Sequence, residues 1–326
     1  YLPMSGTLFF QSERQKRFVR AAFSRYLSPA LVERLAARPE ALRLGGEERE
    51  LTLMFSDIRG FTSVAETMTP EQLTSFMNRF LTPMTEEVLT HSGFIDKYMG
   101  DAIMAFWNAP VAVQDHPVEA CRTALAMRRR LTELNETWRV EFARAGSTFP
   151  GVAIGIGLNT DLCCVGNLGS DQRFDYSALG DGVNLASRLE GQSKTYGVDV
   201  VLNETTVARC GDRIATLELD LIRVKGKKEP ARIFTLVGDG CLWTDDGFAE
   251  FAKQHREMLE AYRQRAWDRA EAAASACLET LETSPDWLPQ GLQLDGLYAL
   301  YRARIDSLRA DPPSAGWDAV FEPGTK

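Results

Sequence analysis

Hydrophobic residues follow two different periods along the first three quarters of the chain. Short apolar runs predict a hairpin around Gly100 and strands at 51–56, 151–158, 161–167, 198–202, 215–219 and 232–237. Apolar residues at helical spacing predict helices that begin near Thr69 and that cover about 117–141 and 183–196. Strands that alternate with helices in this way predict an α+β fold, a sheet with helices packed against it.

Both ends of the chain carry helical patterns without strands. Residues 11–37 show one apolar face at helical spacing, and Gly45-Gly46 marks a linker after them. Beyond Gly238 the pattern is helical and contains no polar cluster of a catalytic type. The sequence therefore predicts three parts: a helical segment over 1–45, a core over 46–238 and a helical extension over 239–326.

The start of the first core helix carries several local signals. Thr69 can act as the N-cap, Pro70 suits the first helical position, and Gln72 can complete a capping box. The apolar stripe that begins at Leu73 indicates a face packed against the core. Pro83 lies inside this helix and should kink it.

Composition narrows the class of protein. With 326 residues, 44% hydrophobic and 25% charged, the chain resembles an ordinary soluble globular protein. A net charge of −8 argues against a nucleic-acid partner, because phosphate binding needs a basic face. No apolar stretch reaches the roughly 18 residues that span a bilayer. The six cysteines show no metal-binding spacing, which indicates a reduced compartment.

The N-terminal residues suggest a membrane nearby. An apolar stretch over 1–10 is followed by basic residues that include Arg14, Lys16 and Arg17. This order is typical of the cytoplasmic flank of a membrane helix. We therefore expect a chain that is itself soluble and lies at the cytoplasmic side of the membrane, with an N-terminal membrane or sensor region preceding it. An ordinary solvated helix with a frayed end is the alternative.

Two aspartates at strand ends are the first candidates for chemistry. Asp57 closes the strand predicted at 51–56, and Asp101 lies in the turn of the hairpin. Mg²⁺ is typically held by one or two carboxylates plus substrate phosphates, and a metal pair can clamp both oxygens of a phosphoryl transfer. Either aspartate alone could instead be a turn or cap residue.

Four motifs in order make residues 47 to 237 resemble the class III nucleotide cyclases. They are Phe55-Ser-Asp-Ile-Arg-Gly-Phe-Thr62, Lys97-Tyr-Met-Gly-Asp101, Gly180-Asp-Gly-Val-Asn-Leu-Ala-Ser-Arg188 and Arg223-Val-Lys-Gly-Lys227. The resemblance implies a palm-like, ferredoxin-like α+β core. It also implies an adenylyl cyclase, in which the ribose 3′-oxygen of ATP attacks the α-phosphate and pyrophosphate leaves.

The resemblance assigns roles to individual residues. It implies two Mg²⁺ or Mn²⁺ ions at Asp57, Ile58 and Asp101. Asn184 and Arg188, four apart on one helix face, would orient the ribose oxygen and neutralise the α-phosphate. The backbone N–H groups of 58–62 would cradle the terminal phosphates at the start of a helix. The residues implied to contact ATP are Gly60, Phe61, Thr62, Lys97, Arg173, Ser177 and Lys225.

Lys97 and Ser177 bear on the choice of base. The resemblance implies that a lysine and a hydroxyl contact a ring nitrogen and the amino group of adenine, whereas guanine-selecting members carry Glu and Cys. The turn at Gly100 breaks the alternation of the strand, so spacing alone does not place the Lys97 side chain. A guanylyl cyclase is therefore the nearest alternative function.

The resemblance further implies a homodimer with two equivalent composite sites. One chain would supply the two aspartates, and the other would supply the base-reading and transition-state residues, since an isologous interface repeats each contact. Both sets are present in this one chain. An alternative of a different class is a catalytically silent module that dimerises and regulates.

Overall fold

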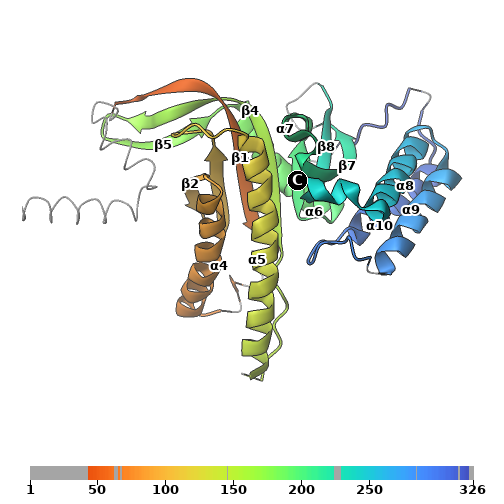
Figure 1. The fold of residues 1–326 in the computed structure, drawn as a ribbon, viewed down its shortest axis with the longest axis horizontal. Helices are drawn as coiled ribbons and strands as arrows, with labels where there is room; N and C mark the ends of the chain where they lie inside the picture. The colour runs from red at the N-terminus through yellow and green to blue at the C-terminus, as the bar shows by residue number, and fades with distance from the viewer. Residues whose placement is uncertain are drawn as a thin grey trace, which may run out of the picture.

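The computed structural model describes residues 43–61, 65–66, 68–144, 146–223, 229–283, 285–314 and 316–322. Within these ranges it contains one mixed sheet of eight strands with helices on both faces (Figure 1). The strand order is β2-β3-β1-β4-β6-β8-β7, with β5 paired to β4. The predicted α+β class is confirmed.

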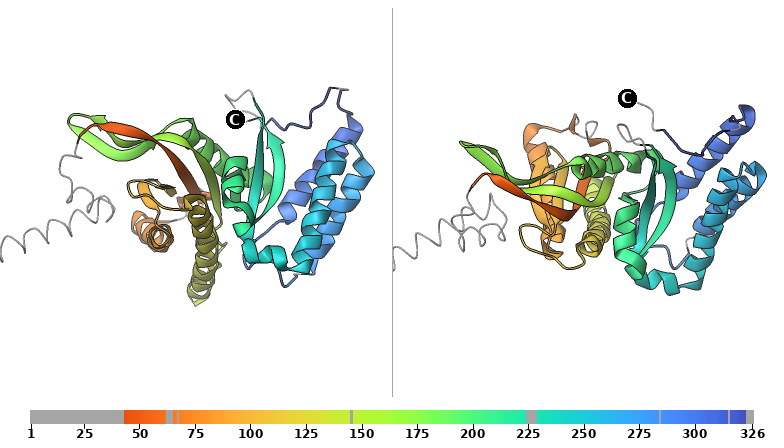
Figure 2. Two further views of the ribbon diagram at one scale, coloured as in Figure 1. Left: turned by 45° about the horizontal axis from the view of Figure 1, so that its top comes forward. Right: turned by 90° about the horizontal axis from the view of Figure 1, so that it is seen from above.

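The strands differ widely in length. Their bounds are β1 Gly45–Ile58, β2 Phe94–Met99, β3 Ala102–Trp107, β4 Ile154–Ser170, β5 Arg173–Leu179, β6 Val200–Asn203, β7 Ile214–Ile222 and β8 Ala231–Asp239. β4 and β6 are parallel, and the other pairs are antiparallel. The far part of β4, together with β5 and the start of β1, projects from the body as an arm (Figures 1 and 2).

Helices pack on both faces of the sheet. Their bounds are α4 Pro70–Thr90, α5 His116–Arg144, α6 Asp181–Tyr196, α7 Glu204–Cys210, α8 Asp246–Arg263, α9 Trp267–Glu282 and α10 Asp295–Ala310. Alternate residues of β4 separate the two faces of the sheet. Ile156 and Leu158 share a core with α4 and α5, while Gly155 and Gly157 face α6.

The helices of the C-terminal extension do not form an isolated bundle. Their buried residues join those of α6, β7 and β8 in one hydrophobic cluster. Arg304 of α10 pairs with the buried Asp220 of β7 at 2.6 Å, and Asp220 also accepts a hydrogen bond from Tyr196 of α6. No helix in the described part of the chain is long and apolar enough to cross a membrane.

The capping box predicted for α4 is confirmed. The Thr69 side chain accepts from the Gln72 N–H at 3.3 Å, and the Gln72 side chain accepts from the Thr69 N–H at 2.9 Å. The helix continues through Pro83 to Thr90. The helix predicted over 11–37 lies outside the described residues.

Three sequence predictions about the sheet are wrong or incomplete. The strands predicted at 151–158 and 161–167 form one strand, β4, and strand β5 was not predicted. The linker expected at Gly45-Gly46 is the beginning of β1. Thr160 lies between the two predicted strands, and within β4 its hydroxyl hydrogen-bonds to Thr52 at 2.9 Å.

Candidate active site

The two predicted metal-binding aspartates lie together. Pairing of Ser56 with Ile103 brings the end of β1 beside the β2–β3 turn, which contains Asp101. The Ile58 N–H lies 3.1 Å from Asp57 Oδ1 and 3.3 Å from Asp101 Oδ2. One N–H therefore donates to both carboxylates, although 43 residues separate Ile58 from Asp101 in the chain.

The electrostatics of this pair favour a bound cation. Burial, a hydrogen bond to Asp101 and the charge of Asp101 raise the pKa of Asp57 to about 7, and the charge of Glu190 adds to this. Two half-buried carboxylates in contact repel each other unless a proton or cation lies between them. No group of three potential metal ligands occurs among the described residues. This donor set fits Mg²⁺ or Mn²⁺, which a few carboxylates and substrate phosphates can hold together.

The backbone after Asp57 offers fewer free N–H groups than expected. The Ile58 N–H is used by the two aspartates, and the Arg59 N–H donates to Ala153 O at 2.8 Å. Gly60 has a φ of +69°, which turns the chain without a side-chain penalty. Within the described part of the 58–62 cradle, the N–H groups of Gly60 and Phe61 remain as candidates for a phosphate; Thr62 lies outside it.

Lys97 and Ser177 come together across β2 and β5. Lys97 Nζ lies 3.5 Å from Ser177 Oγ, within hydrogen-bonding range. Between them lies Asp96, which accepts a 2.6 Å hydrogen bond from Ser177 and pairs with Lys97 at 3.3 Å. Sequence reasoning missed Asp96. An acid directly before the candidate lysine was the available signal, but strand alternation places neighbouring side chains on opposite faces.

Asn184 and Arg188 lie on α6. This helix packs closely on β4 because Gly155 and Gly157 have no side chains. Asn159 of β4 donates to Gly182 O at 2.8 Å, so the start of α6 lies over this part of the strand. Asp57 instead pairs with Gly155. Four residues of a strand span about 13 Å. The Asn184 end of α6 is therefore well separated from Asp57 along β4 of the same chain.

Two predicted site residues remain, Arg173 and Lys225. Arg173 is exposed at the start of β5, where its backbone N–H donates to Ser170 Oγ at 3.2 Å. Four residues separate it from Ser177, about 13 Å along the strand. Lys225 lies outside the described residues.

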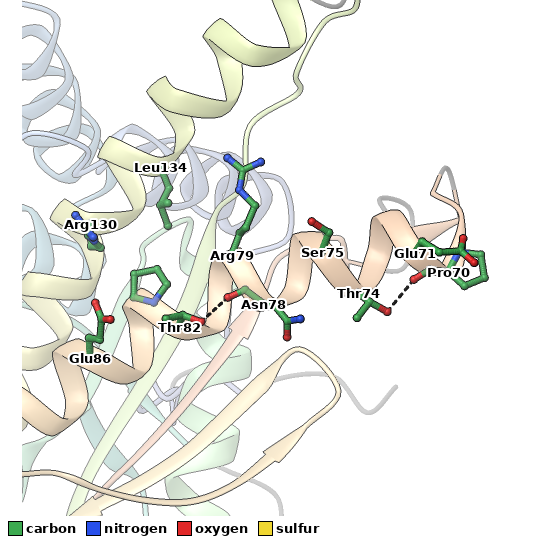
Figure 3. Close-up of a pocket in the computed structure, with 11 residues that line it drawn as sticks. Pro70, Glu71, Thr74, Ser75, Asn78, Arg79, Thr82, Glu86, Arg130 and Leu134 are labelled. Atoms are coloured by element: carbon green, nitrogen blue, oxygen red, sulfur yellow. Dashed lines mark hydrogen bonds between the residues drawn. The ribbon is translucent and has the colours of Figure 1, made fainter. Parts of the chain in front are cut away.

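A groove of about 940 Å³ between α4 and α5 contains none of the predicted site residues (Figure 3). Two of its hydroxyl groups are used locally, because Thr74 donates to Pro70 O and Thr82 donates to Asn78 O. The groove offers no paired carboxylates and no lysine. The candidate chemistry lies at the strand ends and around the arm instead.

Large apolar side chains are exposed on the arm. Leu162 of β4 and Leu179 of β5 are 59% and 60% exposed. Leu179 pairs with Cys164, two residues from Leu162, so the two leucines share one face of the arm. Tyr98 and Met99 of β2 are also exposed. Apolar groups gathered near candidate catalytic residues are typical of a surface that binds another protein.

Comparison with known proteins identifies relatives of this arrangement. Residues 46–238 match the family model described as adenylate and guanylate cyclase catalytic domain. Adenylate cyclase 1 of Rhizobium meliloti is 37% identical over 190 residues, which are 58% of this chain and 28% of that protein. The adenylate cyclase of Anabaena cylindrica is 32% identical over 222 residues, 67% of this chain and 42% of that protein. The chain thus spans less than half the length of these relatives.

Solved structures agree in fold. The adenylyl cyclase CyaB from P. aeruginosa is 36% identical, with a TM-score of 0.55 over 60% of this chain and 96% of that chain. The guanylyl cyclase Cya2 is 32% identical, with a TM-score of 0.53 over the same 60% and 96%. Because the chain is similar to an adenylyl cyclase and to a guanylyl cyclase, the base that it selects must be inferred from the residues of the site.

Proposed function

This chain belongs to the adenylate and guanylate cyclase catalytic domain family, and within that family we propose that it is an adenylyl cyclase. It would convert ATP to 3′,5′-cyclic AMP and pyrophosphate. The observation that carries the proposal is the contact of Asp57 with Asp101. A second contact in the same chain brings Lys97 to Ser177. The first pair suits metal-bound phosphates, and the second suits a purine base.

Asp57 and Asp101 would hold two Mg²⁺ or Mn²⁺ ions, with the main chain of Ile58 beside them. When bound, such ions supply positive charge against the charge that develops on the phosphates. Asn184 would orient the ribose, and Arg188 would pair its planar guanidinium with the α-phosphate. Lys225, in the Arg-Val-Lys-Gly-Lys motif, would bind the terminal phosphates.

We propose that the site is completed by a second copy of the chain. The separation of the Asn184 end of α6 from Asp57 supports this, because one chain does not bring the two together. The exposed Leu162 and Leu179 support it as well, since dimer interfaces need apolar area. In a twofold dimer, each site would combine the aspartates of one chain with the α6 residues of its partner.

Two alternatives are less well supported. A guanylyl cyclase would need an acceptor where Lys97 supplies only donors. A catalytically silent regulator is disfavoured because each candidate catalytic residue type is retained. Incubating the purified chain with Mn²⁺ and either ATP or GTP, and identifying the product by mass spectrometry, decides among the three. Cyclic GMP as the main product, or no cyclic nucleotide, would overturn the proposal.

The composite site is tested by mixing two inactive variants. Asp57→Ala and Asn184→Ala should each lose activity by orders of magnitude, as loss of charge stabilisation predicts. After random re-pairing about half of the dimers are mixed, and each has one intact site of two. Activity should therefore recover to roughly a quarter of wild type.

The matched control mixes Asp57→Ala with Asp101→Ala. Both lesions then affect the metal half of a site, so each site of a mixed dimer stays damaged and no recovery is expected. Background activity of the first mixture, with subunit exchange shown by differently tagged chains, would contradict a composite site. Turnover within about threefold of wild type in either aspartate variant would contradict the metal assignment.

We also propose that the segment before the described residues links the enzyme to a membrane-bound sensor region. The basic residues that follow the apolar stretch over 1–10 support this. Fractionation of cells that express the full-length protein would test it. Recovery of the full-length protein entirely in the soluble fraction would contradict it.

A further inference from the structure

A β-bulge places Asp96 and Lys97 on the same side of β2. Ile95 pairs with Ala105 and Lys97 pairs with Met104, so Asp96 is an additional residue without a partner in the register. In a regular strand these neighbours would point to opposite faces. A bulge re-aims side chains and so lets both approach Ser177.

The contacts of Asp96 define how the Ser177 hydroxyl is oriented. Ser177 Oγ donates to Asp96 Oδ2 at 2.6 Å, a length typical of a hydroxyl bound to an ionised carboxylate. Lys97 Nζ lies 3.3 Å from Asp96 Oδ1 and 3.5 Å from Ser177 Oγ. The Asp96 side chain is fully buried, and Ser177 is 7% exposed. Solvent therefore competes little for the hydrogen bond between Ser177 and Asp96, while Lys97 is 46% exposed.

The partners of Asp96 stabilise its ionised form against the effect of burial. Burial is the largest influence and leaves the pKa of the carboxyl above its ordinary value, while the hydrogen bond from Ser177 and the charge of Lys97 oppose this rise. The nearby Ala178 backbone N–H acts in the same direction on this pKa, as the last and smallest influence. An ionised carboxylate only accepts hydrogen bonds, so the single proton of Ser177 is committed to Asp96.

A serine hydroxyl is otherwise ambiguous in recognition, because it can donate or accept. With its proton committed, Ser177 can offer a ligand only its lone pairs. The 6-amino group of adenine is a donor and suits this acceptor, whereas a 6-oxo group is itself an acceptor. Lys97, which only donates, suits an unprotonated ring nitrogen in the same way.

We propose that Asp96 is a specificity-determining positioning residue, which fixes Ser177 as a hydrogen-bond acceptor and so selects a 6-aminopurine over a 6-oxopurine nucleotide. This inference rests on the proposed function, because it takes Lys97 and Ser177 as the residues that contact the base. It explains how a serine can distinguish the two purine classes. Asp96 itself does not need to touch the nucleotide.

The test compares ATP with inosine triphosphate, whose base has a 6-oxo group but lacks the 2-amino group of guanine. In Asp96→Asn the side-chain amide can donate to Ser177, which frees the serine proton for a 6-oxo group. The ratio of kcat/KM for ATP to that for inosine triphosphate should fall about tenfold, the effect of one mismatched buried hydrogen bond. It should stay above one, because Lys97 still favours ATP.

Two controls separate this effect from general damage. Asp175→Asn changes an exposed acid on β5 and should leave the ratio within about twofold of wild type. In a Ser177→Ala background, adding Asp96→Asn should change the ratio less than about twofold, because the two residues act through one hydrogen bond. Full additivity of the two changes would overturn the proposal.

The outcomes distinguish the inference from the proposed function. If wild type cyclises ATP and Asp96→Asn keeps the wild-type ratio within about twofold, the inference is wrong and the function stands. If wild type forms no cyclic nucleotide, the proposed function fails. The same ratio is then measured as calorimetric affinities for ATP and inosine triphosphate, and an unchanged ratio again overturns the inference.

If circular dichroism shows that Asp96→Asn does not fold, a comparison of two substrates with the wild-type protein tests the proposal instead. Purine riboside triphosphate carries only hydrogen at position 6 and keeps the unprotonated ring nitrogen. Ser177 fixed as an acceptor should favour ATP over this analogue about tenfold, and Ser177→Ala should remove the preference. A wild-type preference below about twofold would overturn the proposal.

Discussion

The close approach of α6 to β4 leaves no room for a side chain at Gly157. A Cβ atom built there would lie 2.2 Å from Ala186 O and 2.3 Å from Glu190 N. Both are backbone atoms of α6, so no rotamer change can relieve the clash. Gly157→Ala should therefore force α6 about 1 Å away from the sheet, since ordinary carbon contacts need about 3.5 Å.

The cost follows from what α6 packs against. The α6 residues Leu185, Ala186, Leu189 and Tyr196 are themselves buried, and a gap of 0.5–1 Å forfeits a quarter to a half of each dispersion contact that opens. Overpacking of this kind costs about 1–3 kcal/mol, and we expect ~3 kcal/mol because only backbone can move. A displacement of about 1 Å at the transition-state residues can also lower kcat about 100-fold.

Two neighbouring glycines give a graded series. At Gly155 a Cβ would meet Ser193 Oγ at 2.3 Å and Glu190 Oε1 at 2.5 Å, which are side-chain ends that can rotate, so Gly155→Ala should cost less. At Gly191, on the outer face of α6, nothing lies within 4 Å. Gly191→Ala should stabilise the protein by about 0.5–1 kcal/mol, as expected for alanine in a helix.

Urea denaturation of the three variants measures the free energy of unfolding, and cyclase assays measure kcat on the same preparations. The expected order of destabilisation is Gly157→Ala, then Gly155→Ala, then Gly191→Ala. If Gly157→Ala unfolds within about 0.5 kcal/mol of wild type, the packing of α6 on β4 described here is refuted. This stability test does not depend on the cyclase activity of the protein.

Two further predictions concern the C-terminal helices. The buried His255 is held neutral between Tyr298 and the Glu218 carbonyl, and burial lowers its pKa from 6.5 to about 4. Because the unfolded chain binds this proton more readily, the contribution of His255 to stability is complete above pH 6.5 and should fall by ~3 kcal/mol as the pH drops to 4. His255→Gln should lack this part of the pH dependence in urea denaturation, and an identical profile would contradict it. Arg304→Met leaves the buried Asp220 without its ion-pair partner and should lower the free energy of unfolding by about 3–5 kcal/mol, whereas the more exposed Arg309→Met should lower it much less. Equal losses for the two arginines would refute this difference.

Local signals explain what the sequence predicted well. Helix and strand periods depend on neighbours a few residues away, and they placed α4, α5 and α6 with small errors at the ends and showed that the C-terminal extension is helical. The capping box at Thr69 is likewise complete within four residues. Asp57 and Asp101 could be proposed as a pair because each closes a predicted strand within a recognisable motif.

Long-range contacts decided the rest. Thr160 lies between the two strands predicted at 151–158 and 161–167, yet β4 continues through it, and hydroxyls from Thr52 and Thr206 hydrogen-bond to its side chain. Asp96 gains its position from a bulge set by pairing with β3, and its hydrogen-bond partner Ser177 lies 81 residues away. The sequence by itself thus determined the helices, most of the strands and most of the residue types at the site. Only the tertiary structure decided strand continuity, register and the direction of each hydrogen bond, because these depend on partners that no local pattern specifies.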